Sequence, residues 1–126
     1  MTLILDSGAL VAAERGERAM WRRLKGALHA GEPPVTHGGV VAQVWRGGSG
    51  RQAPFARALA GVDVAHLDDD LGRRAGILLG TAGLRDAIDA ALVSLAHADD
   101  VIVTDDVGDI ARLIEASGRH IDVVKP

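Results

Sequence analysis

The sequence contains no cysteine and no tyrosine, and it has only one phenylalanine and two tryptophans among 126 residues. The absence of cysteine excludes disulfide bonds, thiolate metal sites and thiol nucleophiles. It is also typical of a reducing compartment, so a cytoplasmic location is expected. Because aromatic rings are so scarce, the core must be packed by small aliphatic side chains, among which the 21 alanines are the most numerous.

The sequence also lacks a long hydrophobic run. The longest stretch without a charged side chain is 13 residues, from Pro33 to Trp45, whereas a membrane-spanning helix needs about 20. No basic residue precedes Asp6, which argues against a signal peptide. A length of 126 residues is close to the usual size of one domain, so a single domain covering residues 1–126 and no membrane association are expected.

The charges are distributed unevenly along the chain. Residues 1–60 carry eight basic and four acidic side chains, a balance of +4, whereas residues 61–126 carry six and 13, a balance of −7. The resulting pI near 5.9 argues against a protein that coats DNA. It leaves open a nucleic acid that is bound through local arginines.

Short apolar runs alternate with segments that have helical periodicity. The predicted strands are Thr2–Leu5, Val35–Thr36, Val62–Leu67, Val101–Val103 and Ile121–Val124. The predicted helices are residues 7–16, Glu17–Ala30, 40–45, Arg51–Ala60, 68–83, Asp86–His97 and Val107–Ser117, with the turn GGSG at 47–50 before the fourth. This alternation predicts an α/β fold, a three-layer αβα sandwich around a mainly parallel sheet of about five strands. Trp21 and Trp45 lie on apolar helical stripes and are expected to belong to the core or to an interface.

Acidic residues follow the predicted strands at the edge where open parallel sheets form their sites. They are Asp6 after the first strand, Asp105 and Asp106 after the fourth, Asp109 one helical turn later, and Asp86 and Asp89 on one side of their helix. Like charges at about 4 Å repel by about 4 kcal/mol at an effective dielectric of 20, so such a group would either protonate or hold a cation. Oxygen-only ligands favour Mg²⁺ or Mn²⁺ over Zn²⁺.

A simpler interpretation exists for each of these acids. An Asp after a strand often only caps the next helix, and this holds for Asp6, Asp68 and Asp105 taken singly. The runs Asp68–Asp70 and Asp99–Asp100 are expected to be solvated helix ends and turns. The combination of Asp6, Asp89 and Asp106 in this order is what favours a common site.

Four segments resemble a known family: LILDSGALVA, VVAQVWRGG, IDAALVSLA and VIVTDDVGDI. They are similar, over the whole chain, to PIN domains, and specifically to the small VapC-like toxins of bacterial toxin–antitoxin pairs. The resemblance implies an αβα fold and an Mg²⁺- or Mn²⁺-dependent ribonuclease. It assigns Asp6, Asp89 and Asp106 as catalytic metal ligands, Asp109 as a further ligand, and Asp86 as an additional acid. It also implies a homodimer and a small antitoxin that covers the acidic groove.

One residue departs from the family pattern. Gln43 stands where the family commonly has Glu, and an amide supplies neither a charge nor a proton acceptor. Asp86 or Glu14 are candidates to replace the missing acid. The alternative function is therefore a catalytically weakened PIN-fold module that only binds RNA or a partner peptide. A phosphoacceptor signalling domain is disfavoured, because Asp68 opens an ordinary helix instead of standing alone after a central strand.

The remaining candidates are supporting residues. The Thr104 hydroxyl could orient the site through hydrogen bonds. Arg46, Arg51 and Arg57, around the GGSG turn, are the candidates for guiding RNA, followed by Arg15 and Arg18. His37 is the histidine of most interest, because it follows the second predicted strand near the proposed site.

Overall fold

The computed structural model describes residues 1–48 and 50–126. Its centre is a sheet of five parallel strands in the order β3-β2-β1-β4-β5. The strands are β1 (Leu3–Leu5), β2 (Val35–His37), β3 (Asp63–Ala65), β4 (Val101–Val103) and β5 (Asp122–Val124). Parallel neighbours cannot be joined by hairpins and need crossover connections, which helices supply here. The predicted α/β class with a five-stranded parallel sheet is confirmed.

The centre of the core lies at strands β1 and β4. Every residue of these two strands is buried, and they pair in register with Ile4 opposite Ile102. Burial on both faces is what their unbroken apolar sequences require. The edge strand β3 is different, because Asp63 and Val64 are exposed.

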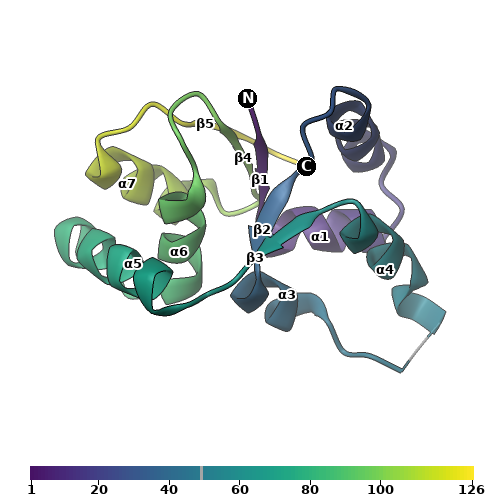
Figure 1. Ribbon diagram of the computed structural model, residues 1–126, viewed down its shortest axis with the longest axis horizontal. Helices are drawn as coiled ribbons and strands as arrows, with labels where there is room; N and C mark the ends of the chain where they lie inside the picture. The colour runs from purple at the N-terminus through teal and green to yellow at the C-terminus, as the bar shows by residue number, and fades with distance from the viewer. Residues whose placement is uncertain (49) are drawn as a thin grey trace.

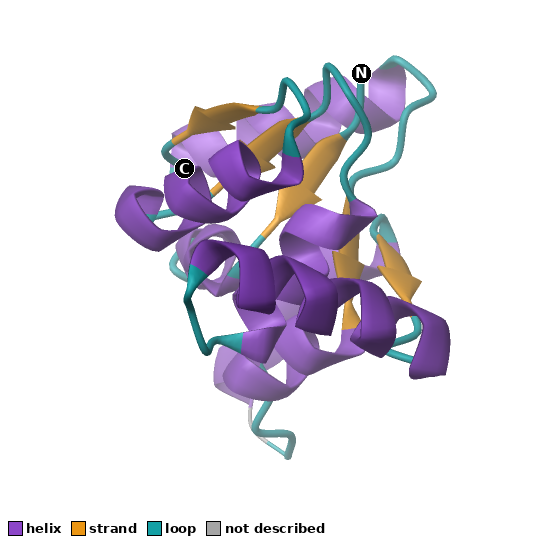
Figure 2. Ribbon diagram, turned by 90° about the vertical axis from the view of Figure 1, so that its left-hand side faces the viewer, coloured by secondary structure: helices purple, strands orange, loops and turns teal. Residues whose placement is uncertain are grey.

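Helices cover both faces of the sheet. The helices α1 (Ser7–Glu14), α2 (Arg18–His29), α3 (Gly38–Val44) and α4 (Ala53–Ala60) lie on one side, and α5 (Asp69–Ala82), α6 (Ala87–Leu95) and α7 (Val107–Ser117) lie on the other (Figure 1). In the perpendicular view the strands run between helices on the near side and helices on the far side (Figure 2). The arrangement is the predicted three-layer sandwich.

Several element boundaries differ from the sequence prediction. The fourth predicted helix does not start at Arg51: a 3₁₀ turn, η1 (Gly50–Gln52), precedes α4, whose first turn contains Pro54. Proline at this position fits the fixed φ of a helix start. The strand predicted over 62–67 is limited to three residues in β3. The predicted turn at 47–50 includes residue 49, which lies outside the described residues.

Trp45 does not lie in the core, which was one of the two places predicted for it. Helix α3 ends at Val44, and Trp45 has an extended backbone with φ −69° and ψ 130°. The side chain has left the helical stripe and is 44% exposed. Trp21 follows the prediction more closely, since it packs against the core and its indole Nε1 donates to the carbonyl of Ala13 at 2.9 Å.

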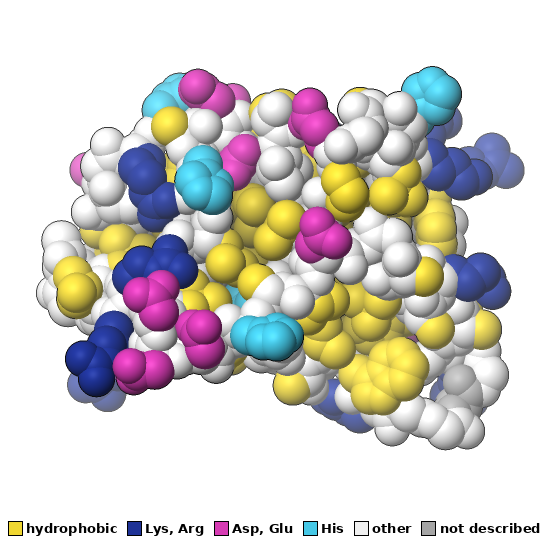
Figure 3. Space-filling view, in the orientation of Figure 1, with side chains coloured by type: hydrophobic (Ala, Val, Ile, Leu, Met, Phe, Trp, Pro, Cys, Tyr) yellow, Lys and Arg dark blue, Asp and Glu magenta, His cyan; other side chains and the backbone are white. Residues whose placement is uncertain are grey.

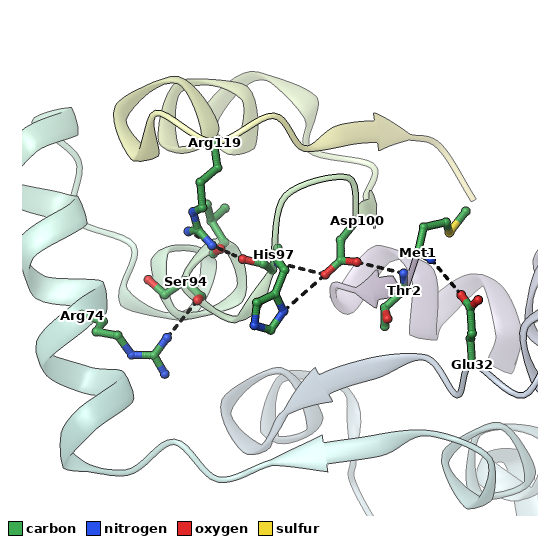
Figure 4. A network of polar contacts seen from close by, with 10 residues as sticks. Met1, Thr2, Glu32, Arg74, Ser94, His97, Asp100 and Arg119 are labelled. Carbon is green, nitrogen blue, oxygen red and sulfur yellow. Dashed lines mark hydrogen bonds and ion pairs between the residues drawn. The ribbon is translucent and has the colours of Figure 1, made fainter.

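The prediction of a solvated Asp99–Asp100 turn is wrong for Asp100. This carboxylate is buried at the amino edge of the sheet, where Oδ1 accepts from the backbone N–H of Thr2 at 2.9 Å and Oδ2 from that of His97 at 2.8 Å (Figure 4). Burial of a charge is tolerated when it is hydrogen-bonded. Asp100 thereby fastens the start of β1 to the turn before β4.

None of the described helices combines the length and the apolar character that a membrane-spanning segment needs.

Candidate active site

The candidate site lies where the strand order reverses. The chain builds β1, β2 and β3 in one direction and then returns to add β4 and β5 on the other side of β1. In open parallel sheets, ligands bind at the carboxyl ends of the two strands that flank such a switch point. Here these ends are Asp6 after β1 and the Thr104–Asp106 segment after β4, and the N–H of Asp6 donates to the carbonyl of Val103 at 3.2 Å.

Asp6 is both a helix cap and a buried acid. Its Oδ1 accepts from the backbone N–H groups of Gly8 at 2.7 Å and Ala9 at 3.3 Å, so it caps α1 as the simpler interpretation predicts. Its side chain is only 6% exposed, and this burial raises the pKa of Asp6 above its ordinary value although the hydrogen bonds oppose the shift. Capping fixes the direction of the carboxylate, so Asp6 can act as a helix cap and as a candidate metal ligand at the same time.

Thr104 connects the two strand ends. Its buried hydroxyl donates to Oδ2 of Asp6 and accepts from the backbone N–H of Asp106 at 2.9 Å. One side chain therefore fixes both the Asp6 carboxylate and the start of the segment that leads into α7. Its neighbour Asp105 is exposed and does not cap α7, because the N-cap is Asp106.

Helix α6 brings two further acids to the site. Asp86 is its N-cap, and Asp86 Oδ1 accepts from the N–H groups of Ile88 and Asp89, both at 3.0 Å. The start of the helix is also held by His37 at the end of β2. Its Nδ1 accepts from the N–H of Gly39 at 3.1 Å, which leaves Nε2 to donate to the carbonyl of Ile88 at 2.9 Å.

The charges of the other candidate acids act on Asp89. Its pKa is raised to about 7, first by burial and then by repulsion from nearby carboxylates. These carboxylates are Asp86, Asp106, Asp6 and Asp109, in decreasing order of effect. The charges of four acids that the sequence assigned to one site therefore raise the pKa of the fifth, Asp89.

The acids of α7 are more accessible. Asp106 is exposed, and its carboxylate makes no capping hydrogen bond. Asp109, in the first turn of α7, is partly exposed and lies 3.9 Å from a guanidinium nitrogen of Arg112 in an exposed pair. Such a pair compensates little charge. The group as a whole retains an excess of negative charge.

The donor chemistry of this group fits a hard divalent cation. All donors are carboxylate oxygens, which Mg²⁺ and Mn²⁺ prefer. Within residues 1–48 and 50–126, no three His, Asp or Glu side chains are close enough together to form a ready-made metal-binding group. A Mg²⁺ ion usually retains several waters and contacts one or two carboxylates. An ion held here would contact only one or two of these carboxylates and keep its remaining waters.

Comparisons with known proteins support the fold. No protein-family model and no curated protein matches the sequence. The fold is similar to that of a chain in the crystal structure of VapBC2 from Rickettsia felis bound to a DNA fragment from their promoter, with a TM-score of 0.73 and 13% identity over 100% of this chain and 99% of that chain. The two chains share one fold. This fold class is the one that the resemblance to PIN domains implies.

Gln43 and its proposed substitutes occupy different places. The Gln43 side chain is exposed on α3. Glu14 lies at the opposite end of α1 from Asp6, where its Oε2 accepts from Gln52 Nε2 at 3.4 Å. Asp86 is the one proposed substitute whose charge acts on Asp89.

The candidate arginines are exposed and differ in their contacts. The Arg46 guanidinium donates to the carbonyls of Ala42 and Trp45 through Nη1 and of Gln43 through Nη2, at 2.8–3.1 Å, so it caps the end of α3. Arg51 lies in η1 and Arg57 on α4. The sequence did not single out Gln52, a buried amide that organises this segment, because nothing in a lone glutamine indicates burial.

Proposed function

We propose that this protein is a divalent-metal-dependent endoribonuclease, the toxin of a toxin–antitoxin pair. The observation that supports this most is Asp89, a half-buried carboxyl near the switch point of the sheet whose pKa is raised to about 7 by burial and by the charges of four other carboxylates. Clustered carboxylates with too little compensating positive charge favour a bound cation, and phosphodiester hydrolysis is a reaction that such a cation assists.

In this proposal Asp6, Asp89 and Asp106 hold one or two Mg²⁺ (or Mn²⁺) ions, with Asp109 directly or through water. When bound, the ion would lower the pKa of a coordinated water and neutralise charge on the scissile phosphate. In the same proposal, Asp86 supplies the negative charge that Gln43 does not.

The protein's own groups hold this arrangement in place. Thr104 and the first N–H groups of α1 fix both oxygens of Asp6. Asp86 fixes the first turn of α6, and His37 ties that turn to β2, so Asp89 is carried on a rigid support. Preorganised carboxylates need no rearrangement when charge develops in the reaction.

The partners follow from the same proposal. Exposed arginines of the α3–α4 segment, Arg46, Arg51 and Arg57, would guide the RNA backbone toward the acidic group. The similar chain belongs to a complex whose name, VapBC2, joins two components, which supports an antitoxin as a partner here. A homodimer is proposed on the resemblance alone.

The second candidate function is a PIN-fold module that binds RNA or a partner without efficient cleavage. The exposed Gln43 favours it, because one anionic ligand of the family pattern is missing. The two functions differ in what Gln43→Glu does. Restoring the acid would create or greatly increase cleavage in a weakened module, and would change little in an enzyme that already uses Asp86.

The test is cleavage of single-stranded RNA in Mg²⁺, Mn²⁺ or EDTA, combined with calorimetric titration of the same ions. We expect cleavage by the wild type in either metal and none in EDTA, and we expect Asp6→Asn and Asp89→Asn to abolish it. Asp69→Asn is the matched control, because Asp69 is an exposed acid of α5 that pairs with Arg73. Cleavage that survives both site substitutions would exclude the proposed mechanism. A wild type that binds the metal without cleaving, and gains activity in Gln43→Glu, would establish the second function.

A further inference from the structure

Trp45 exposes a large aromatic surface on an otherwise aromatic-poor protein. It is 44% exposed, and the sequence has only three Phe and Trp residues in total. A single exposed hydrophobic side chain needs no functional explanation by itself. Trp45 requires such an explanation because its backbone and ring are held by neighbouring residues and because the charge around it is basic.

The backbone of Trp45 is held from both sides. The buried amide of Gln52 donates through Nε2 to the carbonyl of Val44 at 2.9 Å and accepts through Oε1 from the N–H of Arg46 at 2.8 Å. The carbonyl of Trp45 itself accepts from Arg46 Nη1 at 2.8 Å, and its N–H donates to the carbonyl of Val41 at 2.7 Å. An exposed side chain on so fixed a backbone loses little conformational freedom when it binds a ligand.

The indole ring is also supported. It packs against the buried ring of Phe55, with centroids 5.7 Å apart and planes tilted by 58°. Hydrophobic side chains reach the surface over α3 and α4 in the lower right part of Figure 3. The ring is thus braced from the core and still offers a surface to a flat ligand.

The charge of this segment is entirely basic. Residues 33–62 contain three arginines and no Asp or Glu, in a chain whose net charge is −3. The Arg46 guanidinium is bonded to main-chain carbonyls, and within residues 1–48 and 50–126 it forms no ion pair with a carboxylate. Glu14 contacts this segment through the Gln52 amide at 3.4 Å. A surface with this positive charge attracts a polyanion and repels metal cations and basic peptides.

Helix α3 connects this surface to the acidic group. It starts after His37, which is bonded to Ile88, the residue before Asp89, and it ends just before Trp45. Seven helical residues at about 1.5 Å each separate the two ends by roughly 10 Å. At about 3.4 Å per stacked nucleotide, this corresponds to about three nucleotides of a strand.

We propose that Trp45 is a stacking platform for an unpaired base of single-stranded RNA, whose phosphates contact the arginines of the α3–α4 segment. The inference rests on the proposed function, because the strand is then the substrate and the platform lies about three nucleotides from the scissile bond. Aromatic stacking with neighbouring cations is the usual way in which proteins bind single strands without reading a sequence.

The test measures binding of a short oligoribonucleotide in EDTA, by fluorescence anisotropy of the strand and by tryptophan fluorescence. We expect Trp45→Ala to weaken binding about tenfold and Trp45→Phe to weaken it less. The control variant is Ile77→Ala, which removes a 73% exposed apolar side chain from α5 and should leave affinity unchanged. Binding should quench the fluorescence of the wild type and not that of Trp45→Phe, in which Trp21 is the remaining fluorophore.

A second ligand separates stacking from charge. An abasic strand of equal length keeps the phosphates and lacks the bases, so wild type and Trp45→Ala should bind it equally. Equal RNA affinities for wild type and Trp45→Ala would overturn the platform and assign the exposed ring to a protein interface. An equal loss for RNA and the abasic strand would also overturn it.

Cleavage assays on the same samples distinguish the two proposals. Cleavage without any dependence on Trp45 refutes the platform alone. Trp45-dependent binding without cleavage refutes the ribonuclease alone.

Discussion

At the scale of one residue, the pKa of Asp89 reports how strongly burial and neighbouring charges oppose its ionisation. Its ordinary pKa is near 3.8, and burial together with four neighbouring carboxylates raises it to about 7. An acid in this state is partly protonated at neutral pH. It becomes fully ionised at higher pH, or when a bound cation offsets the repulsion. Strongly shifted carboxyls of this kind are typical of functional sites, since structure alone would favour an apolar side chain.

The burial of Asp89 and the repulsion from its neighbours together predict a pH-dependent gain in stability for Asp89→Asn. The folded wild type binds the Asp89 proton more tightly than the unfolded chain does. The charged carboxylate therefore costs no stability below about pH 4, costs increasingly more from pH 4 to pH 7, and costs the full amount above pH 7. In metal-free buffer at pH 8 we expect the variant to melt about 3–6 °C above the wild type. At pH 4 the two should melt together.

Thermal unfolding followed by circular dichroism at both pH values provides the measurement. Asp69→Asn is the control, since Asp69 is 81% exposed and should show no such pH dependence. A melting difference of equal size at pH 4 and pH 8 would mean that the substitution acts through packing and not through charge.

At the scale of elements, the site depends on how closely α1 approaches the segment after β4. A Cβ atom added at Gly8 would lie 2.9 Å from Oδ2 of Asp105 and 3.1 Å from its backbone nitrogen. The first turn of α1 can therefore reach the switch point only because residue 8 has no side chain. Gly26, inside α2, is the opposite case, since an added Cβ would meet nothing within 4 Å.

The two glycines predict opposite effects of the same substitution. Gly26→Ala should increase the free energy of unfolding by about 0.5–1 kcal/mol, because alanine favours a helix more than glycine does. Gly8→Ala should lower it despite the same gain in propensity, because the backbone of Asp105 must move. Urea denaturation of both variants at pH 7 measures the difference. Stabilisation by both substitutions would show that the contact at Gly8 relaxes easily.

The elements also show how far the sequence is informative. Apolar periodicity predicted the five strands of the sheet and the helices of the two layers that cover it. It could do so because the buried positions of a strand or helix recur with the period of that element. The end of α3 was missed, and with it the exposure of Trp45, because Arg46 and Gln52 terminate the helix through contacts that no local pattern reveals. Asp100 was misjudged for the same reason, since its donors include Thr2, which is distant in sequence.

The site itself was only partly predictable. The sequence placed Asp6 and Asp106 after strands and so at the same edge of a parallel sheet, whereas the pairing of β1 with β4 that brings them together comes from the structure. The hydroxyl bridge of Thr104 was anticipated only as a possibility, and the role of His37 in fixing α6 only as a location. Such contacts depend on side-chain directions of elements that are far apart in the chain.

At the scale of the whole molecule, charge is separated between two regions. The acidic group is assembled mainly from the second half of the chain, and the acid-free segment of residues 33–62 leads from its edge. A further group of basic residues lies on α2, where Arg22 lines a pocket with Met1 and Leu3 at the amino end of β1. Lys and Arg side chains lie along the right-hand margin in Figure 3 and also on the left, where they stand beside Asp and Glu. A protein with a net charge of −3 can thus attract a polyanion locally.

This separation predicts which arginines contribute to binding RNA. For a single strand, the logarithm of the affinity falls with the logarithm of the salt concentration, with a slope of about −0.7 for each phosphate contact. Arg57→Gln, on α4 beside the proposed path, should make that slope shallower by about 0.7. Arg22→Gln removes an equal charge from α2, beside the opposite end of β1, and should leave the slope unchanged although it alters the net charge equally. Oligoribonucleotide binding over a range of KCl concentrations measures both. If the two variants change the slope equally, attraction depends on the net charge of the molecule, and the α3–α4 segment is not the path of the strand.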